Sequence, residues 1–218
     1  MLTVKEAIQQ RRSIRKYKPD PVPDELIDEL IEAARLAPSG TNSQPWKFIV
    51  MKDPDLKRQV RKAALNQKYV EEAPLVIVCC ADANRSRKAA RQTNWEDLRK
   101  AGAVDDISDE LVNQIERGMN PEAPETDPNI WLPSARANVS IAITHMMLMA
   151  TALGLGTVWL GATGGDVTRK LLSIPDDVYL VALLCVGYPD QSPPQRPRLS
   201  RDEILLPEPI PAKAAALA

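Results

Sequence analysis

Near the N-terminus, three arginines surround one serine: Arg11, Arg12, Ser13 and Arg15. Guanidinium groups form paired hydrogen bonds to oxygen anions, and the serine hydroxyl adds another donor. The cluster therefore favours a site for an oxygen-rich anion, with phosphate as the first candidate. An alternative stays open, because arginines also stabilise the C-terminal end of a helix through its dipole. A nucleic-acid surface is disfavoured, since the net charge is -1 and only one short stretch is basic.

A second polar segment, Pro38 to Trp46, follows some two dozen residues later and reads Pro-Ser-Gly-Thr-Asn-Ser-Gln-Pro-Trp. Its serine, asparagine and glutamine side chains offer hydrogen-bond donors and acceptors, and its tryptophan offers an aromatic surface. The segment predicts a polar turn that ends in an aromatic residue.

Other residue types with chemical potential are few. The three cysteines lie in apolar, strand-like runs without metal-ligand spacing, which predicts buried and reduced thiols: Cys79, Cys80 and Cys185. The single histidine, His145, lies in an apolar helical run and is expected in the core or an interface, not as a base. One histidine also argues against a histidine-rich metal site, so no metal is expected.

Apolar periodicity and turn signals predict the elements that position these segments. Helices are expected at 3–10, from 24 to before Pro38, and at 53–64, 135–153 and 166–172, and strands at 47–51, 75–81, 157–160 and 179–186. Thr3 is expected to cap the first helix in a capping box with Glu6, and Asp24 to cap the second. The helix at 135–153 is apolar on almost every face, which predicts burial all round in a core or subunit interface.

The length of 218 residues suits one domain over residues 1–218. Charge rises and apolar periodicity weakens between about 83 and 129, which indicates an insertion outside the core. The proline-rich chain from about 190 to 218 indicates an extended arm of the kind that lies on a partner subunit, with disorder of its last residues as the alternative. The apolar runs are too short to span a bilayer and no signal-peptide pattern occurs, so a cytoplasmic protein without membrane contact is expected.

Five segments of the chain resemble the FMN-dependent nitroreductase family, and they occur in the family's order. They are the arginine cluster, residues 38–46, residues 154–161 (Gly-Leu-Gly-Thr-Val-Trp-Leu-Gly), residues 186–189 (Val-Gly-Tyr-Pro) and Arg196-Pro197-Arg198. The resemblance covers nearly the whole chain except 83–129. In this context we expect the insertion to act as a lid over the flavin, with a purely structural role as the alternative. It implies an α+β fold with a mixed, mainly antiparallel sheet flanked by helices, in an intertwined homodimer that holds FMN in the subunit interface.

The resemblance also implies which residues bind FMN. The arginine cluster would hold the phosphate, ribityl chain and pyrimidine edge, and two C-terminal arginines would add charge at the phosphate. The polar turn would reach the flavin from the other subunit, Asn66 would meet the pyrimidine edge, and the backbone N–H of Gly161 would lie near flavin N5. The full set of implied contacts is Arg11, Arg12, Ser13, Arg15, Pro38, Ser39, Asn42, Gln44, Asn66, Trp159, Leu160, Gly161, Arg196 and Arg198.

The implied activity is hydride transfer from NADH or NADPH through FMN to a nitroaromatic, a quinone or a related oxidised small molecule, in two-electron, ping-pong steps. Because the flavin carries this chemistry, no catalytic side chain is required of the protein. Alternatives within the fold are flavin fragmentation and reductive dehalogenation; deiodinases carry a lid before the strand at 75–81, for which residues 51–74 are too few. Outside catalysis, a flavin-binding sensor and a structural dimer without cofactor remain. The acceptor and the choice between NADH and NADPH stay open.

Overall fold

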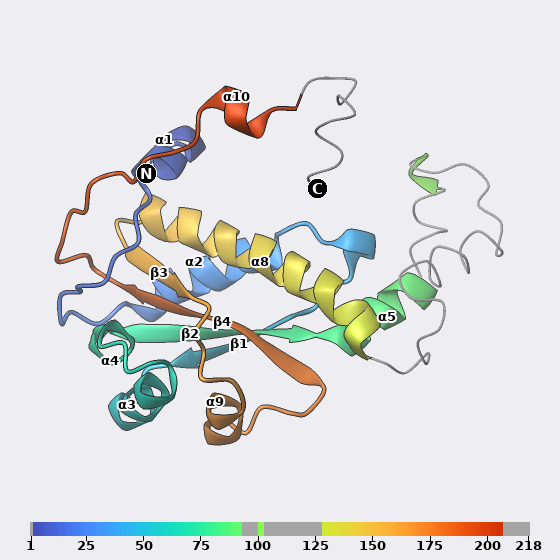
Figure 1. The fold of residues 1–218 in the computed structure, drawn as a ribbon, viewed down its shortest axis with the longest axis horizontal. Helices are drawn as coiled ribbons and strands as arrows, with labels where there is room; N and C mark the ends of the chain where they lie inside the picture. The colour runs from blue at the N-terminus through green and yellow to red at the C-terminus, as the bar shows by residue number, and fades with distance from the viewer. Residues whose placement is uncertain (1, 93–99, 103–127, 207–218) are drawn as a thin grey trace.

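The structure, a computed structural model, describes residues 2–92, 100–102 and 128–206 (Figure 1). Its helices are α1 (Val4–Gln10), α2 (Asp24–Arg35), the 3-10 turn η1 (Gly40–Asn42), α3 (Pro54–Ala63), α4 (Tyr69–Glu72), α5 (Ala83–Gln92), α8 (Pro128–Ala152), α9 (Gly165–Leu171) and α10 (Arg201–Ile204). Its strands are β1 (Trp46–Met51), β2 (Leu75–Asp82), β3 (Gly156–Leu160) and β4 (Val178–Gly187).

In the described part of the chain, four strands form one sheet in the order β1-β2-β4-β3, and every neighbouring pair is antiparallel. The parallel link among these residues is a single bridge between Ser13 and Thr157, at the outer edge of β3. The predicted α+β fold with a mainly antiparallel sheet is confirmed.

Helices cover both faces of the sheet, with α2 and α8 on one side and α3 and α9 on the other (Figure 1). Successive side chains of a strand point to opposite faces. On β2, Ile77 and Cys79 accordingly pack with residues of α2 and α8, whereas Val78 and Cys80 pack with Val60 of α3. The continuous apolar run of β2 thus supplies the core on both faces.

The predicted helix caps are partly correct. At α1, Glu6 N donates to Thr3 Oγ1 at 3.3 Å and Thr3 N donates to Glu6 Oε2 at 2.8 Å, which confirms the capping box. The prediction that Asp24 caps α2 is wrong: Pro23 takes the N-cap position without a side-chain hydrogen bond. Asp24 is the first helical residue, and its carboxylate pairs with Lys52 after β1.

The long helix α8 begins seven residues earlier than predicted, at Pro128. The sequence interpretation treated proline as a helix breaker. Pro128 instead occupies the first position of the helix, where its missing N–H needs no partner, and Pro133 lies inside α8. One side of α8 is buried in the core, whereas Ile141 on its outer side is 39% exposed and Thr144 is exposed. The described single chain therefore does not bury α8 on every side. Burial of its outer side in a subunit interface stays a prediction.

The cysteines are free and buried in β2 and β4, as predicted. Burial raises the pKa of Cys80 to about 11 and that of Cys185 to about 12, so both thiols stay protonated near neutral pH.

Within the described ranges, no group of three or more His, Cys, Asp or Glu side chains could hold a metal ion. None of the helices in those ranges has the length and apolar character to cross a membrane.

The predicted insertion and arm are described only in part. The insertion starts with α5, which contacts α8, and Ala83 belongs to the core. Residues 93–99 and 103–127, on which the lid prediction rests, lie outside the described residues.

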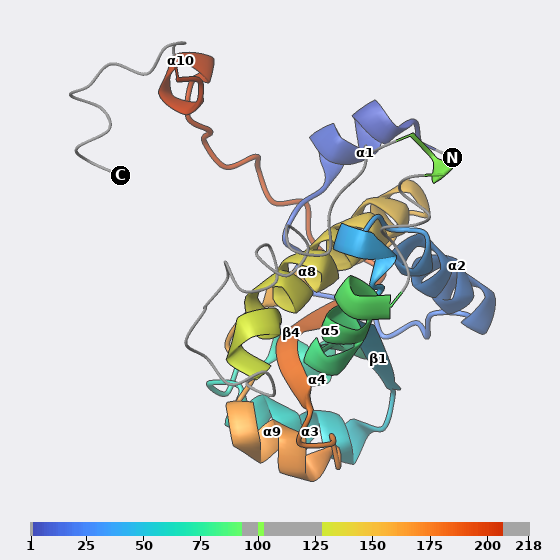
Figure 2. The same ribbon diagram turned by 90° about the vertical axis from the view of Figure 1, so that its right-hand side faces the viewer.

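The arm extends from the end of β4 to α10, and Figure 2 shows α10 standing away from the sheet and its helices. It exposes the apolar side chains of Leu199 and Ile204, and residues 207–218 lie outside the described part.

Candidate cofactor site

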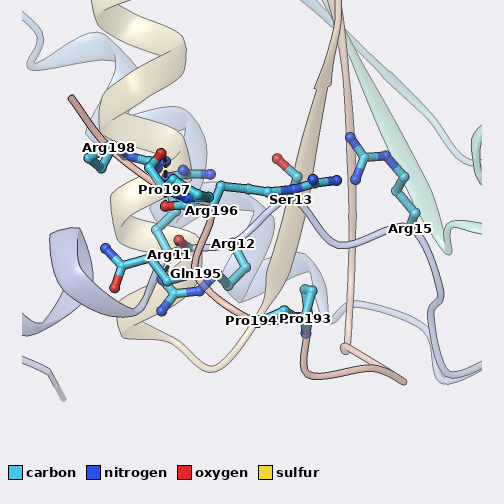
Figure 3. A pocket seen from close by; sticks show the side chains of 10 residues that line it. All are labelled: Arg11, Arg12, Ser13, Arg15, Pro193, Pro194, Gln195, Arg196, Pro197 and Arg198. Carbon is cyan, nitrogen blue, oxygen red and sulfur yellow. Dashed lines mark hydrogen bonds between the residues drawn. The ribbon is translucent and has the colours of Figure 1, made fainter.

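The N-terminal cluster and the two C-terminal arginines line one cavity, which we call the arginine cavity (Figure 3). Its volume is about 570 Å³. Its lining consists of Arg11, Arg12, Ser13, Arg15, Pro193, Pro194, Gln195, Arg196, Pro197 and Arg198. Two segments from opposite ends of the sequence therefore meet here, and six of the predicted contact residues come together.

The backbone of the cluster is anchored to the sheet by Ile14. Its N–H donates to Thr157 O at 2.9 Å, and its buried side chain lies against Gly156. A Cβ on Gly156 would be 2.6 Å from Ile14 Cγ1, so this close approach requires glycine. Tyr17 Oη also donates to Ile14 O at 2.7 Å. The residues on either side of Ile14 are thereby held at the arginine cavity.

The positive charge of the arginine cavity is paired with no carboxylate among the described residues. Arg12 Nη1 donates to two carbonyl oxygens at the end of α1, those of Gln9 (2.7 Å) and Arg11 (2.9 Å). This contact is the one expected from the helix-end alternative, yet a guanidinium offers further N–H donors. Burial lowers the pKa of Arg11, and repulsion from Arg198 and Arg12 adds to the effect. A phosphate group with two negative charges would offset this repulsion and accept from these N–H groups, so the donor set fits a phosphate.

Arg15 stands apart from the other arginines in Figure 3. Its guanidinium carbon lies 6.0 Å from the centroid of the Tyr69 ring, within the range of a cation–π contact. Tyr69 opens α4, three positions after Asn66, which adopts a left-handed conformation (φ 56°) between α3 and α4. The structure thus places Arg15 beside the short segment that carries Asn66. The sequence interpretation did not name Tyr69, which contacts Arg15 here.

The polar turn lies at a different place in the same chain. Gly40 N donates to Asn138 Oδ1 at 3.1 Å, in the first half of α8, whereas Arg12 borders a smaller cavity together with Thr151 near the end of α8. Thr151 and Asn138 are 13 positions apart, which is roughly 20 Å along a helix. Figure 1 shows the light-blue turn after α2 beside the first half of α8. Within one chain, the arginine cavity is therefore not completed by Pro38, Ser39, Asn42 and Gln44.

Two residues that hold this turn were not predicted. Asn138 accepts from Gly40, as described above, and Arg85 Nε of α5 donates to Ser43 O at 2.9 Å. Both contacts join residues that are at least 42 positions apart, so no local pattern in the sequence indicates them.

The three predicted residues at the end of β3 have different environments. The Leu160 side chain is buried in the core, so it can offer only backbone groups to a ligand, and Trp159 is partly buried. Gly161 lines a second cavity of about 490 Å³ together with Arg136 and Arg169. A Cβ on Gly161 would meet no atom within 4 Å, and its φ lies outside the left-handed region. No described contact of this chain requires a glycine at position 161. A glycine there would, however, allow a ligand or a second chain to approach the backbone closely.

Comparison with known proteins assigns this architecture to a class. The model of the nitroreductase family matches residues 8–188, so the chain belongs to that family and is an oxidoreductase by class. An NADH dehydrogenase of Thermus thermophilus is 32% identical over 94% of this chain and 96% of its own length. An FMN reductase [NAD(P)H] of Bacillus subtilis is 31% identical over 94% of this chain and 73% of its own. The solved structure of B. megaterium NfrA2 covers 100% of this chain and 78% of its own, with a TM-score of 0.75 and 26% identity.

Proposed function

We propose that the protein is an FMN-dependent oxidoreductase that uses NADH or NADPH to reduce oxidised small molecules. The observation that carries the proposal is the arginine cavity, in which several guanidinium groups converge without a described carboxylate partner. The names of two similar proteins support the proposal: an FMN reductase [NAD(P)H] supports both the flavin and the nicotinamide donor, and an NADH dehydrogenase supports the donor.

In this proposal, the arginine cavity binds the FMN phosphate. Arg11, Arg12 and Ser13 donate from one wall, and Arg196 and Arg198 donate from the arm. Arg15 and Asn66 bind the pyrimidine edge, since Arg15 already lies against Tyr69 in the segment that follows Asn66. Trp159 and Leu160 lie under the ring, and Gly161 offers its backbone N–H near flavin N5.

Bound FMN would supply the redox chemistry, by accepting a hydride from the nicotinamide donor and passing two electrons to the acceptor in a separate step. The protein's own part is then to bind, orient and shield. Guanidinium groups beside the pyrimidine edge favour negative charge there, which assists two-electron transfer. Nitroaromatics and quinones are the acceptor class that we assign.

We also propose that the active form is a homodimer in which the polar turn of one chain completes the arginine cavity of the other. The separation of roughly 20 Å along α8 supports this, because one chain leaves the two regions apart. The outer side of α8, with Ile141, and the apolar arm residue Leu199 supply surface for such an interface.

A complementation experiment tests the shared site. Arg12→Ala and Asn42→Ala chains with different affinity tags are co-expressed, and the mixed dimer is purified through both tags. If the turn acts on the partner's cavity, one of the two sites carries both substitutions and the other carries none, so about half of the wild-type flavin content returns. If both regions serve the same chain, each site keeps one defect and no recovery is expected.

The proposed reaction is tested by anaerobic absorbance titration of the FMN-loaded protein with NADH and then NADPH. Loss of the visible flavin band, followed by its return on addition of a nitroaromatic or a quinone, is the expected result, and it also identifies the preferred donor. Flavin that binds but resists both donors would contradict the reductase proposal and favour flavin fragmentation, dehalogenation or sensing. Failure to bind FMN at all would overturn the cofactor assignment.

A further inference from the structure

The polar turn has a backbone conformation that its own sequence does not favour. Thr41, Asn42 and Gln44 have φ values of 51°, 49° and 46°, all in the left-handed region. Residues other than glycine adopt this region at a free-energy cost, and asparagine tolerates it better than threonine or glutamine. Several such residues in succession persist only where surrounding contacts hold them.

Those contacts come from two helices and one strand. Gly40 N donates to Asn138 Oδ1 at 3.1 Å, and Asn138 Nδ2 lies 3.5 Å from Ser43 Oγ. Arg85 Nε donates to Ser43 O at 2.9 Å, and Asp82 N at the end of β2 donates to Pro45 O at 2.7 Å. The turn is thus fixed at its beginning, middle and end.

Burial makes two of these contacts specific. Ser43 is 2% exposed and Asn138 is 6% exposed, so water cannot readily replace either partner. A buried polar group that loses its partner destabilises the arrangement that placed it there. Asn138 therefore favours the conformation in which Gly40 and Ser43 both lie against α8.

The outward side of the turn retains donors. Gln44 N donates to Ser39 Oγ at 3.0 Å, and Gln44 Nε2 donates to Asn42 Oδ1 at 3.0 Å. Since both oxygens act as acceptors within the turn, the Ser39 hydroxyl hydrogen and the Asn42 amide N–H groups remain for an acceptor outside it; within the described ranges they donate to no residue. The turn is therefore a preformed set of donors.

We propose that Asn138 and Arg85 are positioning residues that hold the polar turn ready to bind the cofactor in the arginine cavity of a second copy of this chain. The inference rests on the proposed function. Asn138 fixes the position of Gly40 and Ser43 on α8, and Arg85 ties the turn to the first helical turn of α5. Their effect on the reaction is indirect, through the placement of Ser39 and Asn42.

The test compares FMN affinity, measured by quenching of flavin fluorescence, among matched variants. Asn138→Leu keeps the size of the side chain but removes both hydrogen bonds, and we expect it to weaken FMN binding about tenfold. Asn138→Asp keeps the acceptor for Gly40 N–H and is expected to stay within about threefold of wild type. Arg85→Met, which removes the bond to Ser43 O, is expected to weaken binding about three- to fivefold.

Two controls separate positioning from general loss of stability. Ile27→Val removes one methyl group from the core between α2 and α8, so it lowers thermal stability without touching the turn. Inorganic phosphate, measured by its competition with FMN, should bind Asn138→Leu as it binds the wild type, because the arginine cavity is intact. Arg12→Ala should instead lose phosphate binding.

Wild-type FMN affinity in Asn138→Leu would overturn the inference and leave the proposed function standing. Equal weakening in Ile27→Val and Asn138→Leu would also overturn it, since a stability effect would then explain both. If the wild-type protein binds no FMN, the proposed function fails first and this inference fails with it.

Discussion

The arginine cavity and the polar turn are organised in opposite ways. The guanidinium of Arg12 donates to carbonyl oxygens of its own neighbourhood, and Arg198 Nη1 does the same with Arg196 O and Pro197 O, both at 3.1 Å. The turn is held by side chains from distant elements, Asn138 of α8 and Arg85 of α5.

The difference concerns what each region lacks without a ligand. The arginine cavity combines like charges and lowers the pKa of Arg11, so an anion would stabilise it. The turn already has its hydrogen bonds, so a ligand gains binding energy from it without having to order it. One region thus supplies electrostatic attraction, and the other supplies fixed geometry.

The largest expected effect comes from the arginine cavity. Arg12→Ala should raise the dissociation constant for FMN about 30- to 100-fold, equivalent to about 2–3 kcal/mol, because charge-assisted bonds to the phosphate are lost. Arg12→Lys should fall between this variant and wild type, since it keeps the charge but not the paired donors. Fluorescence titration with FMN gives both values.

Arg35→Ala is the matched control for this loss of an arginine. Arg35 lies on α2 and pairs with Glu32 at 2.6 Å, away from the arginine cavity. Its loss should leave FMN affinity unchanged. Comparable FMN affinities for Arg12→Ala and wild type would assign Arg12 to the helix-end role, in which it only stabilises the end of α1.

A smaller effect is expected from salt. Raising NaCl from about 0.05 M to about 0.5 M should weaken FMN binding to the wild type by roughly tenfold, because ions screen guanidinium groups that are only partly buried. Asn138→Leu should show the same salt dependence from a weaker starting affinity, since its defect is geometric. A flatter salt dependence in Asn138→Leu than in wild type would show that the two regions do not act separately.

The same contrast explains what could be predicted from the sequence. The strands follow from continuous apolar runs such as that of β2, and the cap of α1 follows from Thr3 and Glu6, because these signals are local. The arginine cluster was found for the same reason. Asn138 and Arg85 were missed because their partners lie 98 and 42 positions away, and neither residue type is unusual where it occurs. A cluster of arginines that are adjacent in the sequence can be predicted from the sequence alone. The contacts that fix the polar turn cannot, because they depend on how distant elements pack.

The smallest expected effect concerns the segment between α3 and α4, which carries Asn66. Glu71 of α4 accepts from Arg61 Nη1 at 2.7 Å and from Arg58 Nε at 3.2 Å, and both arginines belong to α3. The hydrogen bond from Arg61, followed by that from Arg58, lowers the pKa of Glu71 below its ordinary value of 4.5. A carboxylate with a lowered pKa stabilises the folded state fully above its ordinary pKa, and this contribution disappears as the pH falls through the lowered value.

The difference in melting temperature between wild type and Glu71→Gln should therefore be present at pH 7 and shrink as the pH falls below about 4.5. Its size should be a few degrees at most, because the pair is partly exposed to solvent. Thermal melts of the two proteins across this range provide the measurement, and Glu32→Gln on α2 provides the control for an exposed ion pair remote from Asn66. Acid should also weaken FMN binding more in wild type than in Glu71→Gln, because only the wild type loses the link between α3 and α4. A difference in melting temperature that does not shrink as the pH falls below about 4.5 would mean that Glu71 acts through packing, and that the position of Asn66 does not depend on its charge.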